Sequence, residues 1–199
     1  MKKAKVIIVG AGPAGLFAAY ELVKQGQRDV LILEKGRALV KREKTETLCG
    51  VGGSGTFSDG KLHFSLVLSH EKLLDFCSRS EAQKLIDDVE KIFKDLGVKA
   101  PVTPIKMEEV GKLVKECQRF NVQLYNWKCR HVGSNVLPKI IQRLVDYLSE
   151  KEVVIRDQVE VREFEKLADS FEIRTGKGSY RAEKILVAPG RVGTKWLQI

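Results

Sequence analysis

Residues 5–34, KVIIVGAGPAGLFAAYELVKQGQRDVLILE, contain the signals that decide the fold of this chain. The continuous β-branched run at residues 6–9 is typical of a strand that is buried on both faces, as in a parallel sheet. A glycine-rich turn follows at once, and residues 16–23 then form a helix-favouring stretch. A second apolar strand at residues 30–33 ends in an acidic residue. This order of strand, glycine turn, helix and strand predicts one βαβ unit.

The glycines of the turn have separate roles in a dinucleotide-binding unit. Gly10 permits the tight turn, Gly12 has no side chain to block a pyrophosphate, and Gly15 lets the helix approach the sheet. The start of the helix also offers unpaired N–H groups and the positive end of its dipole to a diphosphate. The alternative is a merely structural turn. We expect five residues to contact an adenine dinucleotide here: Gly10, Gly12, Pro13, Ala14 and Gly15.

The acidic residue at the tip of the second strand is Glu34, nineteen residues after Gly15. A carboxylate at this place can accept hydrogen bonds from the ribose hydroxyls of an adenosine. Its charge would repel a 2′-phosphate, which favours FAD or NAD over NADP. Lys35 and Arg37 weaken that preference slightly. Both are candidate cofactor contacts, and either can instead be a solvated surface charge.

A second glycine-rich segment follows at residues 47–62, TLCGVGGSGTFSDGKL. Glycines let a backbone pass close to a flat ligand, and successive N–H groups can form a nest for an anion. A flexible linker is the alternative, but the apolar residues within the segment argue against it. This loop favours a flavin over NAD alone. We expect its backbone to contact the cofactor through Gly52, Gly53, Ser54, Gly55 and Thr56.

Three motifs resemble one known family. CGVGGSGTFSDGK at 49–61, RHVGS at 130–134 and APGR at 188–191 are similar to the FAD-dependent dehydrogenases of the glutathione-reductase-like flavoprotein superfamily, especially poorly characterised bacterial and archaeal members. The resemblance spans essentially the whole chain and is most specific at 52–61. It implies FAD as the cofactor and a Rossmann-like FAD/NAD(P)-binding fold of the α/β class, with a parallel sheet, a small antiparallel β-meander and a helical insertion.

The resemblance also assigns roles near the end of the chain. The element formed by Ala188, Pro189 and Gly190 would lie beside the dinucleotide, although by itself it reads as a buried strand that runs into a turn. The backbone of Val161 would pair with the edge of the adenine, with Val159 as the competing register. A strand valine that belongs only to the core is the alternative.

Apolar spacing predicts three helices in the middle of the chain. Ser80 and Gln83 form a candidate capping box for the first, the second covers about 108–119, and the third begins near Ser134. Short strands at 153–155, 159–164 and 171–175 predict a small antiparallel meander, after which the chain returns to the parallel sheet at residue 185.

These elements suggest a discontinuous FAD-binding Rossmann-like domain at residues 1–48 and 150–199. Residues 49–149 would supply the glycine-rich flavin loop and a mainly helical insertion. Members of the resembled superfamily are longer and hold the ribityl chain with a later Gly-Asp element, which this sequence lacks. We therefore expect the chain to be the N-terminal part of an enzyme, with the substrate-binding and FAD-completing part missing or supplied by a second subunit.

Composition narrows the class of protein. With 199 residues, 43% hydrophobic and 31% charged, the chain has the make-up of a soluble globular protein. The net charge of +9 is spread between interleaved acidic residues, which argues against a nucleic-acid partner, and we expect no membrane partner. Four cysteines without paired short spacing fit the reduced cytoplasm. Cys129 and His131 lack the second close pair that a zinc site needs, so no metal is expected.

Together these features predict an FAD-binding oxidoreductase, a dehydrogenase that transfers hydride or electrons between flavin and an unknown small molecule. A non-catalytic dinucleotide-binding module, or one subunit of a split flavoprotein, is the alternative, and an NAD enzyme without flavin is a weaker one. No catalytic residue is identified. His63 and Cys49 are each candidates to face the flavin, or ordinary structural residues.

Overall fold

The computed structural model describes residues 2–66, 73–194 and 196–198. Its backbone divides into two compact units. The first combines Met1–Ser58 with Ile141–Ile199, and the second is Asp59–Ile140. The domain boundaries expected from the sequence, at residues 48 and 150, remain a prediction.

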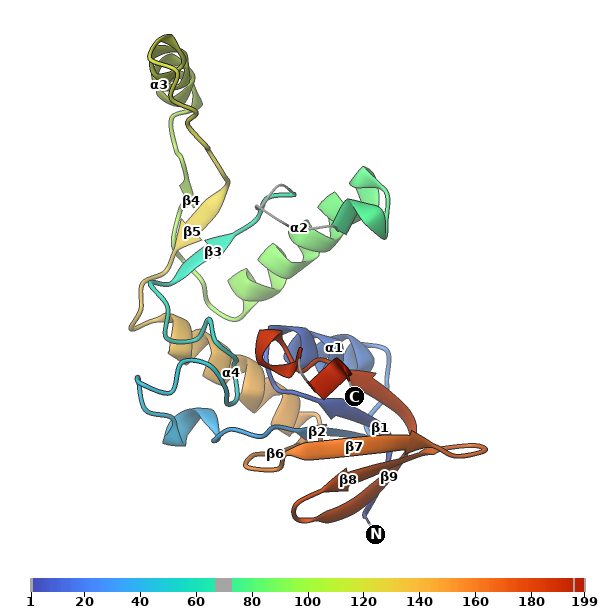
Figure 1. The fold of residues 1–199 in the computed structure, drawn as a ribbon. Coiled ribbons are helices and arrows are strands. Elements are labelled where there is room, and N and C mark those ends of the chain that lie inside the picture. Colours follow the sequence, from blue (N-terminus) through green and yellow to red (C-terminus); the bar gives the residue numbers. More distant parts are fainter. Residues whose placement is uncertain (1, 67–72, 195, 199) are drawn as a thin grey trace. The chain divides into compact units, whose positions relative to one another are not determined.

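A six-stranded sheet forms the first unit, in the order β6-β2-β1-β9-β8-β7 (Figure 1). Four strands run parallel in its first part, and the last two are antiparallel to their neighbours. The bounds of the six, in chain order, are β1 Lys2–Val9, β2 Val30–Leu33, β6 Val154–Arg156, β7 Val161–Lys166, β8 Phe171–Thr175 and β9 Gly178–Val187. The predicted α/β class with a mainly parallel, Rossmann-like sheet and a β-meander is confirmed.

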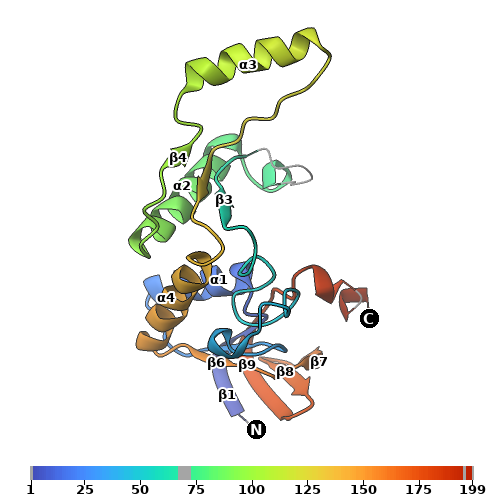
Figure 2. The ribbon, with the colours of Figure 1, turned by 90° about the vertical axis from the view of Figure 1, so that its left-hand side faces the viewer.

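The second half of the central strand β1, residues 6–9, is buried on both faces, as its β-branched run predicts. On one face lie α1 (Pro13–Lys24) and α4 (Leu137–Glu150), side by side, with the rings of Tyr20 and Tyr147 5.3 Å apart (Figure 2). On the other face, Ile7 and Val9 join a core with side chains of the meander, including Ile173 and Tyr180. Because β1 and β2 pair in parallel, their carboxyl ends lie at the same edge of the sheet.

The strand partners differ in two places from the sequence-based expectation. Residues 154–156 join the parallel part, beside β2, and are not part of the meander. The chain also does not return to the parallel sheet at residue 185, because β9 is one long strand that pairs with β8 through its first half and with β1 along most of its length. Alternating apolar residues indicate an extended segment but do not identify its partner.

The second unit contains two helices, α2 (Arg79–Asp95) and α3 (Met107–Arg119), and a three-stranded antiparallel sheet in the order β3-β5-β4. Its strands are β3 Lys61–His63, β4 Val102–Thr103 and β5 Cys129–His131. The sequence predicted the helices but not this sheet, whose strands are too short to show alternation. Short 3-10 turns complete the chain: η1 Leu39–Lys41, η2 Leu73–Asp75, η3 Arg191–Gly193 and η4 Trp196–Gln198.

The start of α2 corrects one prediction. Ser78, not Ser80, is the N-cap, and its capping box is completed by Glu81 rather than Gln83. Both pairs have the required spacing of three residues, but it is the Glu81 carboxylate that accepts the backbone N–H of Ser78, while the Ser78 hydroxyl accepts the N–H of Glu81. The third helix begins three residues after Ser134, and Pro138 lies in its first turn, where a missing N–H is tolerated.

A nearly buried charge cluster joins α2 to β5 in the second unit. Glu90 receives hydrogen bonds from Lys128 and from Arg130, whose Nε lies 2.8 Å from its carboxylate. Burial by itself would raise the pKa of Glu90, but the hydrogen bonds and charges of the two cations outweigh it, so the pKa lies below its ordinary value. The carboxylate is therefore the stable form in the folded unit.

We expect Glu90→Gln to lower the free energy of unfolding by about 2 kcal/mol at pH 7, because it leaves the Arg130 guanidinium without its countercharge. A lowered pKa contributes stability above the unfolded value of about 4.3, and this is lost as the pH falls through the folded pKa. Urea unfolding between neutral and acidic pH should show this loss in the unchanged protein and a smaller one in the variant. Equal pH profiles would contradict the assignment.

Candidate functional site

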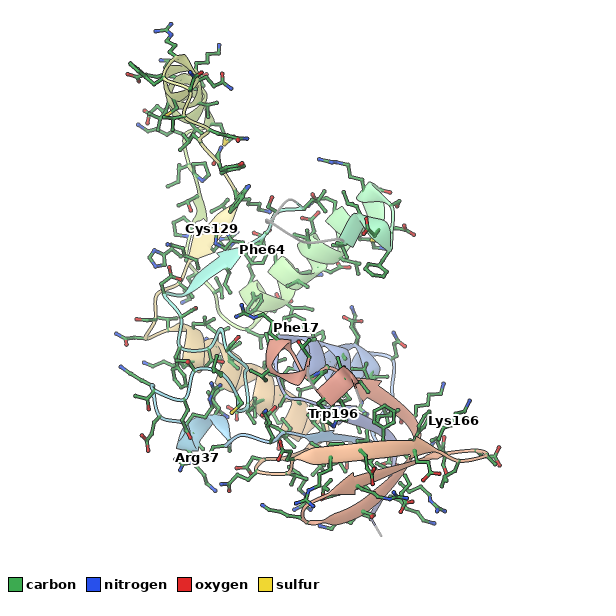
Figure 3. The ribbon with its side chains drawn as sticks, in the orientation of Figure 1. Phe17, Arg37, Phe64, Cys129, Lys166 and Trp196 are labelled. Carbon is green, nitrogen blue, oxygen red and sulfur yellow. The ribbon has the colours of Figure 1, made fainter. Side chains whose placement is uncertain are left out.

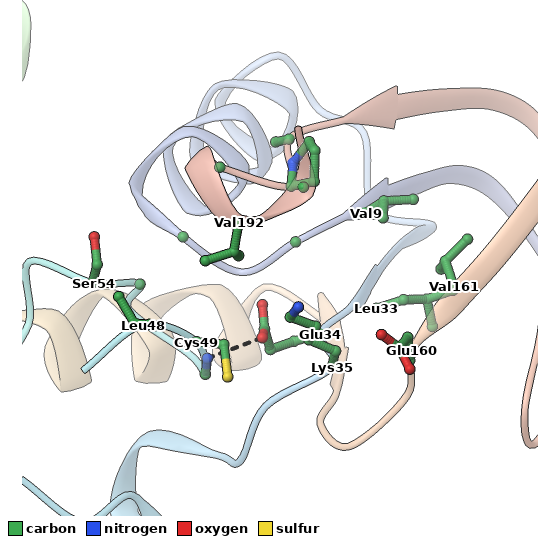
Figure 4. A pocket seen from close by; sticks show the side chains of 18 of the residues that line it. Val9, Leu33, Glu34, Lys35, Leu48, Cys49, Ser54, Glu160, Val161 and Val192 are labelled. Carbon is green, nitrogen blue, oxygen red and sulfur yellow. Dashed lines mark hydrogen bonds between the residues drawn. The ribbon is translucent and has the colours of Figure 1, made fainter. Parts of the chain in front are cut away.

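A pocket of about 510 Å³ opens in the first unit where three strands end (Figure 4). Its walls come from the carboxyl ends of β1, β2 and β9, the glycine turn after β1, residues 48–54, the start of β7 and the C-terminal turns. Ligands of open α/β sheets bind in such a crevice, where the strand connections leave in opposite directions. Here β1 has β2 on one side and β9 on the other.

Two glycines of the first turn are required by the fold itself. A Cβ on Gly10, whose φ is +102°, would lie 2.3 Å from the carbonyl oxygen of Ala188. A Cβ on Gly15 would lie 2.0 Å from the carbonyl oxygen of Gly10. These contacts bring β9 and α1 close to the end of β1, so both positions need glycine with or without a ligand.

Gly12 differs from them. It lines the pocket, its φ of −74° suits any residue, and the nearest atom to an added Cβ is the Cα of Gly53 at 3.9 Å. Packing therefore does not explain a glycine here. The open space above the backbone of Gly12 fits a group that must approach this backbone closely, as a diphosphate does.

The start of α1 favours an anion at the same place. Gly12 is the N-cap and makes no side-chain capping bond, Pro13 occupies the first turn, and that turn carries no acidic residue. The first N–H groups of a helix have no partner within it, and the helix dipole adds a partial positive charge. The residues present therefore fit a phosphate at the mouth of this helix.

Glu34 is 6% exposed and holds three backbone segments together. One carboxylate oxygen accepts the N–H of Ala11 at 2.8 Å, and the other accepts those of Gly36 at 2.8 Å and Gly50 at 3.0 Å. An ionised carboxylate offers about four acceptor positions. Three of them are used within the protein, which leaves about one for a ligand hydroxyl. The sequence predicted the location of Glu34 but not this structural role.

The second glycine-rich loop lies against the first turn. The N–H of Gly52 donates to the carbonyl of Ala11 at 2.8 Å, and a Cβ on Gly53 would come within 2.8 Å of the Pro13 ring. Within the loop, Gly53 donates to Gly50 and Thr56 to Gly53. These N–H groups are therefore engaged inside the protein. Of the loop residues expected to contact the cofactor, Gly53 and Ser54 line the pocket.

Arg42 organises this loop and was not singled out in the sequence, where it stands among charged neighbours in the run KREK. Its buried guanidinium donates to the carbonyls of Glu46, Val51 and Gly53 at 2.6 to 3.0 Å, and it lies 4.9 Å from the centre of the Phe57 ring. Burial lowers the pKa of Arg42, which nearby acidic groups partly offset. By gathering carbonyls on one side, Arg42 determines the path of the loop along the pocket.

The pocket brings together eleven of the seventeen residues predicted to bind the cofactor: Gly10, Gly12, Pro13, Glu34, Lys35, Gly53, Ser54, Val161, Ala188, Pro189 and Gly190. Six others do not line it: Ala14, Gly15, Arg37, Gly52, Gly55 and Thr56. Arg37 instead forms ion pairs with Glu43 and Glu46. The pocket also contains Cys49, a candidate from the sequence to face the flavin, and residues that were not predicted as cofactor contacts, among them Glu160 and Trp196.

Other candidate sites have ordinary surroundings. His63 belongs to β3 of the second unit, where its ring meets Trp127 edge to face. Across the described residues, no cluster of three or more His, Cys, Asp or Glu side chains is placed to hold a metal ion. Nor does any helix in that part of the chain have the length and apolar character needed to cross a membrane.

Comparison with known proteins identifies the class. Residues 5–123 match the family described as FAD dependent oxidoreductase, and the chain belongs to this family. This confirms the coarser part of the resemblance seen in the sequence, but the match does not support the glutathione-reductase-like superfamily. An uncharacterised protein of Clostridium beijerinckii is 38% identical over 74 residues, which cover 30% of this chain and 14% of that protein.

Solved structures share the fold at low sequence identity. L-amino acid deaminase from Proteus vulgaris matches all of this chain and 50% of its own length, with 18% identity and a TM-score of 0.61. NikD, an unusual amino acid oxidase essential for nikkomycin biosynthesis, matches all of this chain and 54% of its own length, with 18% identity and a TM-score of 0.57. Glycine oxidase from Geobacillus kaustophilus matches 97% of this chain and 58% of its own length, with 16% identity and a TM-score of 0.56. The chain thus spans about half the length of these proteins.

We expect Glu34→Gln to lower the free energy of unfolding by about 2 kcal/mol without any ligand present. The amide must turn an NH₂ group toward at least one backbone N–H that now donates to the carboxylate, which leaves buried donors unpaired. Urea unfolding of the ligand-free chain measures this. An unchanged midpoint would mean that the three bonds of Glu34 contribute little to folding.

Arg42→Met retains the length of the apolar stem but removes all the donors of the guanidinium. The carbonyls of Val51 and Gly53 then lose a charged partner, and we expect a loss of about 2 kcal/mol. Arg42→Lys should recover only part of it, because a compact ammonium cannot span the same acceptors as the planar fork. Thermal unfolding of the three proteins checks this order, and full recovery by lysine would contradict it.

Proposed function

We propose that the first unit binds FAD and that the protein is an FAD-dependent oxidoreductase, a dehydrogenase acting between the flavin and a small molecule. The observation that carries the proposal is the open space at Gly12, between an uncapped helix N-terminus and the Glu34 carboxylate. The partial positive charge of the helix N-terminus thus matches the diphosphate of an adenosine diphosphate, and the Glu34 carboxylate matches its ribose hydroxyls. Membership of the FAD dependent oxidoreductase family supports the choice of cofactor.

Each group of the site has a distinct task in this proposal. The first turn of α1 holds the diphosphate, and the remaining acceptor position of Glu34 receives a ribose hydroxyl. Ser54, at the pocket edge of the glycine-rich loop, supplies a further polar contact, and exposed Lys35 adds positive charge beside the phosphates. Bound FAD supplies the hydride or electron transfer, while the chain provides position and electrostatics.

The finer assignment rests on the sequence alone. The loop at 49–61 supports membership of the bacterial and archaeal dehydrogenase group. We also propose that the substrate and the electron partner are small molecules rather than a nucleic acid or a membrane. The proposal further includes an additional domain or a second subunit, and a cytoplasmic location. A dinucleotide-binding module without catalysis differs from the enzyme by one observation, namely whether flavin held by the protein is reduced and reoxidised by added donors and acceptors.

Gly12→Ala tests the binding site. The added methyl group meets no protein atom closer than 3.9 Å, so the variant should fold normally, while its Cβ occupies the space needed for the diphosphate. We expect FAD affinity, measured by calorimetry, to fall by about tenfold or more, as for the loss of about 1.4 kcal/mol.

Gly111→Ala in α3 is the matched control, because an added Cβ there meets nothing within 4 Å and lies in the other unit. It should leave FAD affinity unchanged. FAD affinities that are equal in Gly12→Ala and Gly111→Ala would remove the basis of the proposal.

A further inference from the structure

Trp196 is an aromatic residue of the pocket that the proposed roles above do not use. It lies in η4, where Figure 3 labels its side chain. It is half-buried and belongs to the pocket wall. Its indole N–H donates to the carbonyl of Arg162 at 2.6 Å, and its ring centre lies 5.9 Å from that of Phe164 at an angle of 52°. The polar edge of the indole is therefore satisfied by β7, and the ring is held in one place.

The place of Trp196 along the pocket follows from β7. Arg162, its hydrogen-bond partner, is the residue after Val161, and both Val161 and Glu160 line the same pocket. Figure 4 shows Val161 and Glu160 on one side of Glu34 and Ser54 on the other. The end of the pocket that contains β7 thus lies across Glu34 from the second glycine-rich loop.

Given the proposed function, the order of the second glycine-rich loop, Glu34 and β7 along the pocket indicates which end of the pocket holds the adenine. If the helix N-terminus at Gly12 holds the diphosphate and Glu34 the ribose, the base attached to that ribose lies beyond Glu34, on the side of β7. We propose that Trp196 is the stacking surface for the adenine ring of the dinucleotide. An indole offers a large apolar face to a purine, and stacking of a base on an aromatic side chain is favourable with little dependence on the base.

Intrinsic fluorescence tests this contact directly. The chain has two tryptophans, so Trp127→Phe leaves Trp196 as the only indole. ADP, which carries the adenine but no flavin, should quench this emission in a saturable way. Inorganic pyrophosphate, which carries only the phosphates, should leave it unchanged. Saturable binding of ADP, shown by calorimetry, without any change in the Trp196 emission would overturn the inference.

Affinity supplies the second measurement. Trp196→Ala should weaken ADP binding by about tenfold, Trp196→Phe should weaken it much less, and neither should alter pyrophosphate binding. If Trp196 had a purely structural role, Trp196→Ala would weaken the binding of ADP and pyrophosphate together, or of neither. Trp196→Phe would then give no selective recovery of ADP binding. Equal effects on the two ligands, or no effect on either, would contradict stacking.

The two proposals fail in different ways. If the unchanged chain binds neither ADP nor FAD, the proposed function fails and the stacking role fails with it. If ADP binding is lost in Gly12→Ala but equal in Trp196→Ala and the unchanged chain, the dinucleotide site stands and Trp196 has no part in it.

Discussion

The hydrogen bonds of one buried carboxylate hold the candidate site together. Glu34 ends β2 and accepts the backbone N–H groups of Ala11, Gly36 and Gly50. These donors belong to the glycine turn, to the segment after β2 and to the second glycine-rich loop. Charged acceptors form the stronger class of hydrogen bond, and burial keeps water from competing for them. The same carboxylate therefore shapes the pocket and faces the sugar of the proposed ligand.

Glycine serves the fold at some positions and the pocket at another. Gly10 and Gly15 let β9 and α1 approach the end of β1, where any side chain would collide with a carbonyl oxygen. Gly12 meets no such obstacle, so its bare backbone faces the pocket. Arg42 also constrains the second glycine-rich loop, because its guanidinium donates hydrogen bonds to the carbonyls of Val51 and Gly53. The glycine turn and the second glycine-rich loop, which both line the pocket, are thus held in place by contacts within the protein.

Much of the fold was predictable because its signals are local. The strand at 30–33 and the meander strand at 171–175 have the predicted bounds, since apolar runs and turn residues mark them. The capping serine of α2 was misassigned because Ser78 and Ser80 have equivalent partners three residues later. The partners of β6 and β9, and the sheet of the second unit, depend on pairing between distant segments, which residue patterns do not specify.

The sequence by itself determined the βαβ unit, its glycine turn and the acidic residue at the tip of β2, because these depend on spacing within some thirty residues. Only the tertiary structure decided which of the predicted residues share one pocket. Glu160 and Trp196 reach it from segments more than a hundred residues beyond the glycine turn, and Arg37 turns to Glu43 and Glu46 instead. The physical reason is that a pocket is formed by strand pairing and packing, which bring distant residues together irrespective of their order in the chain.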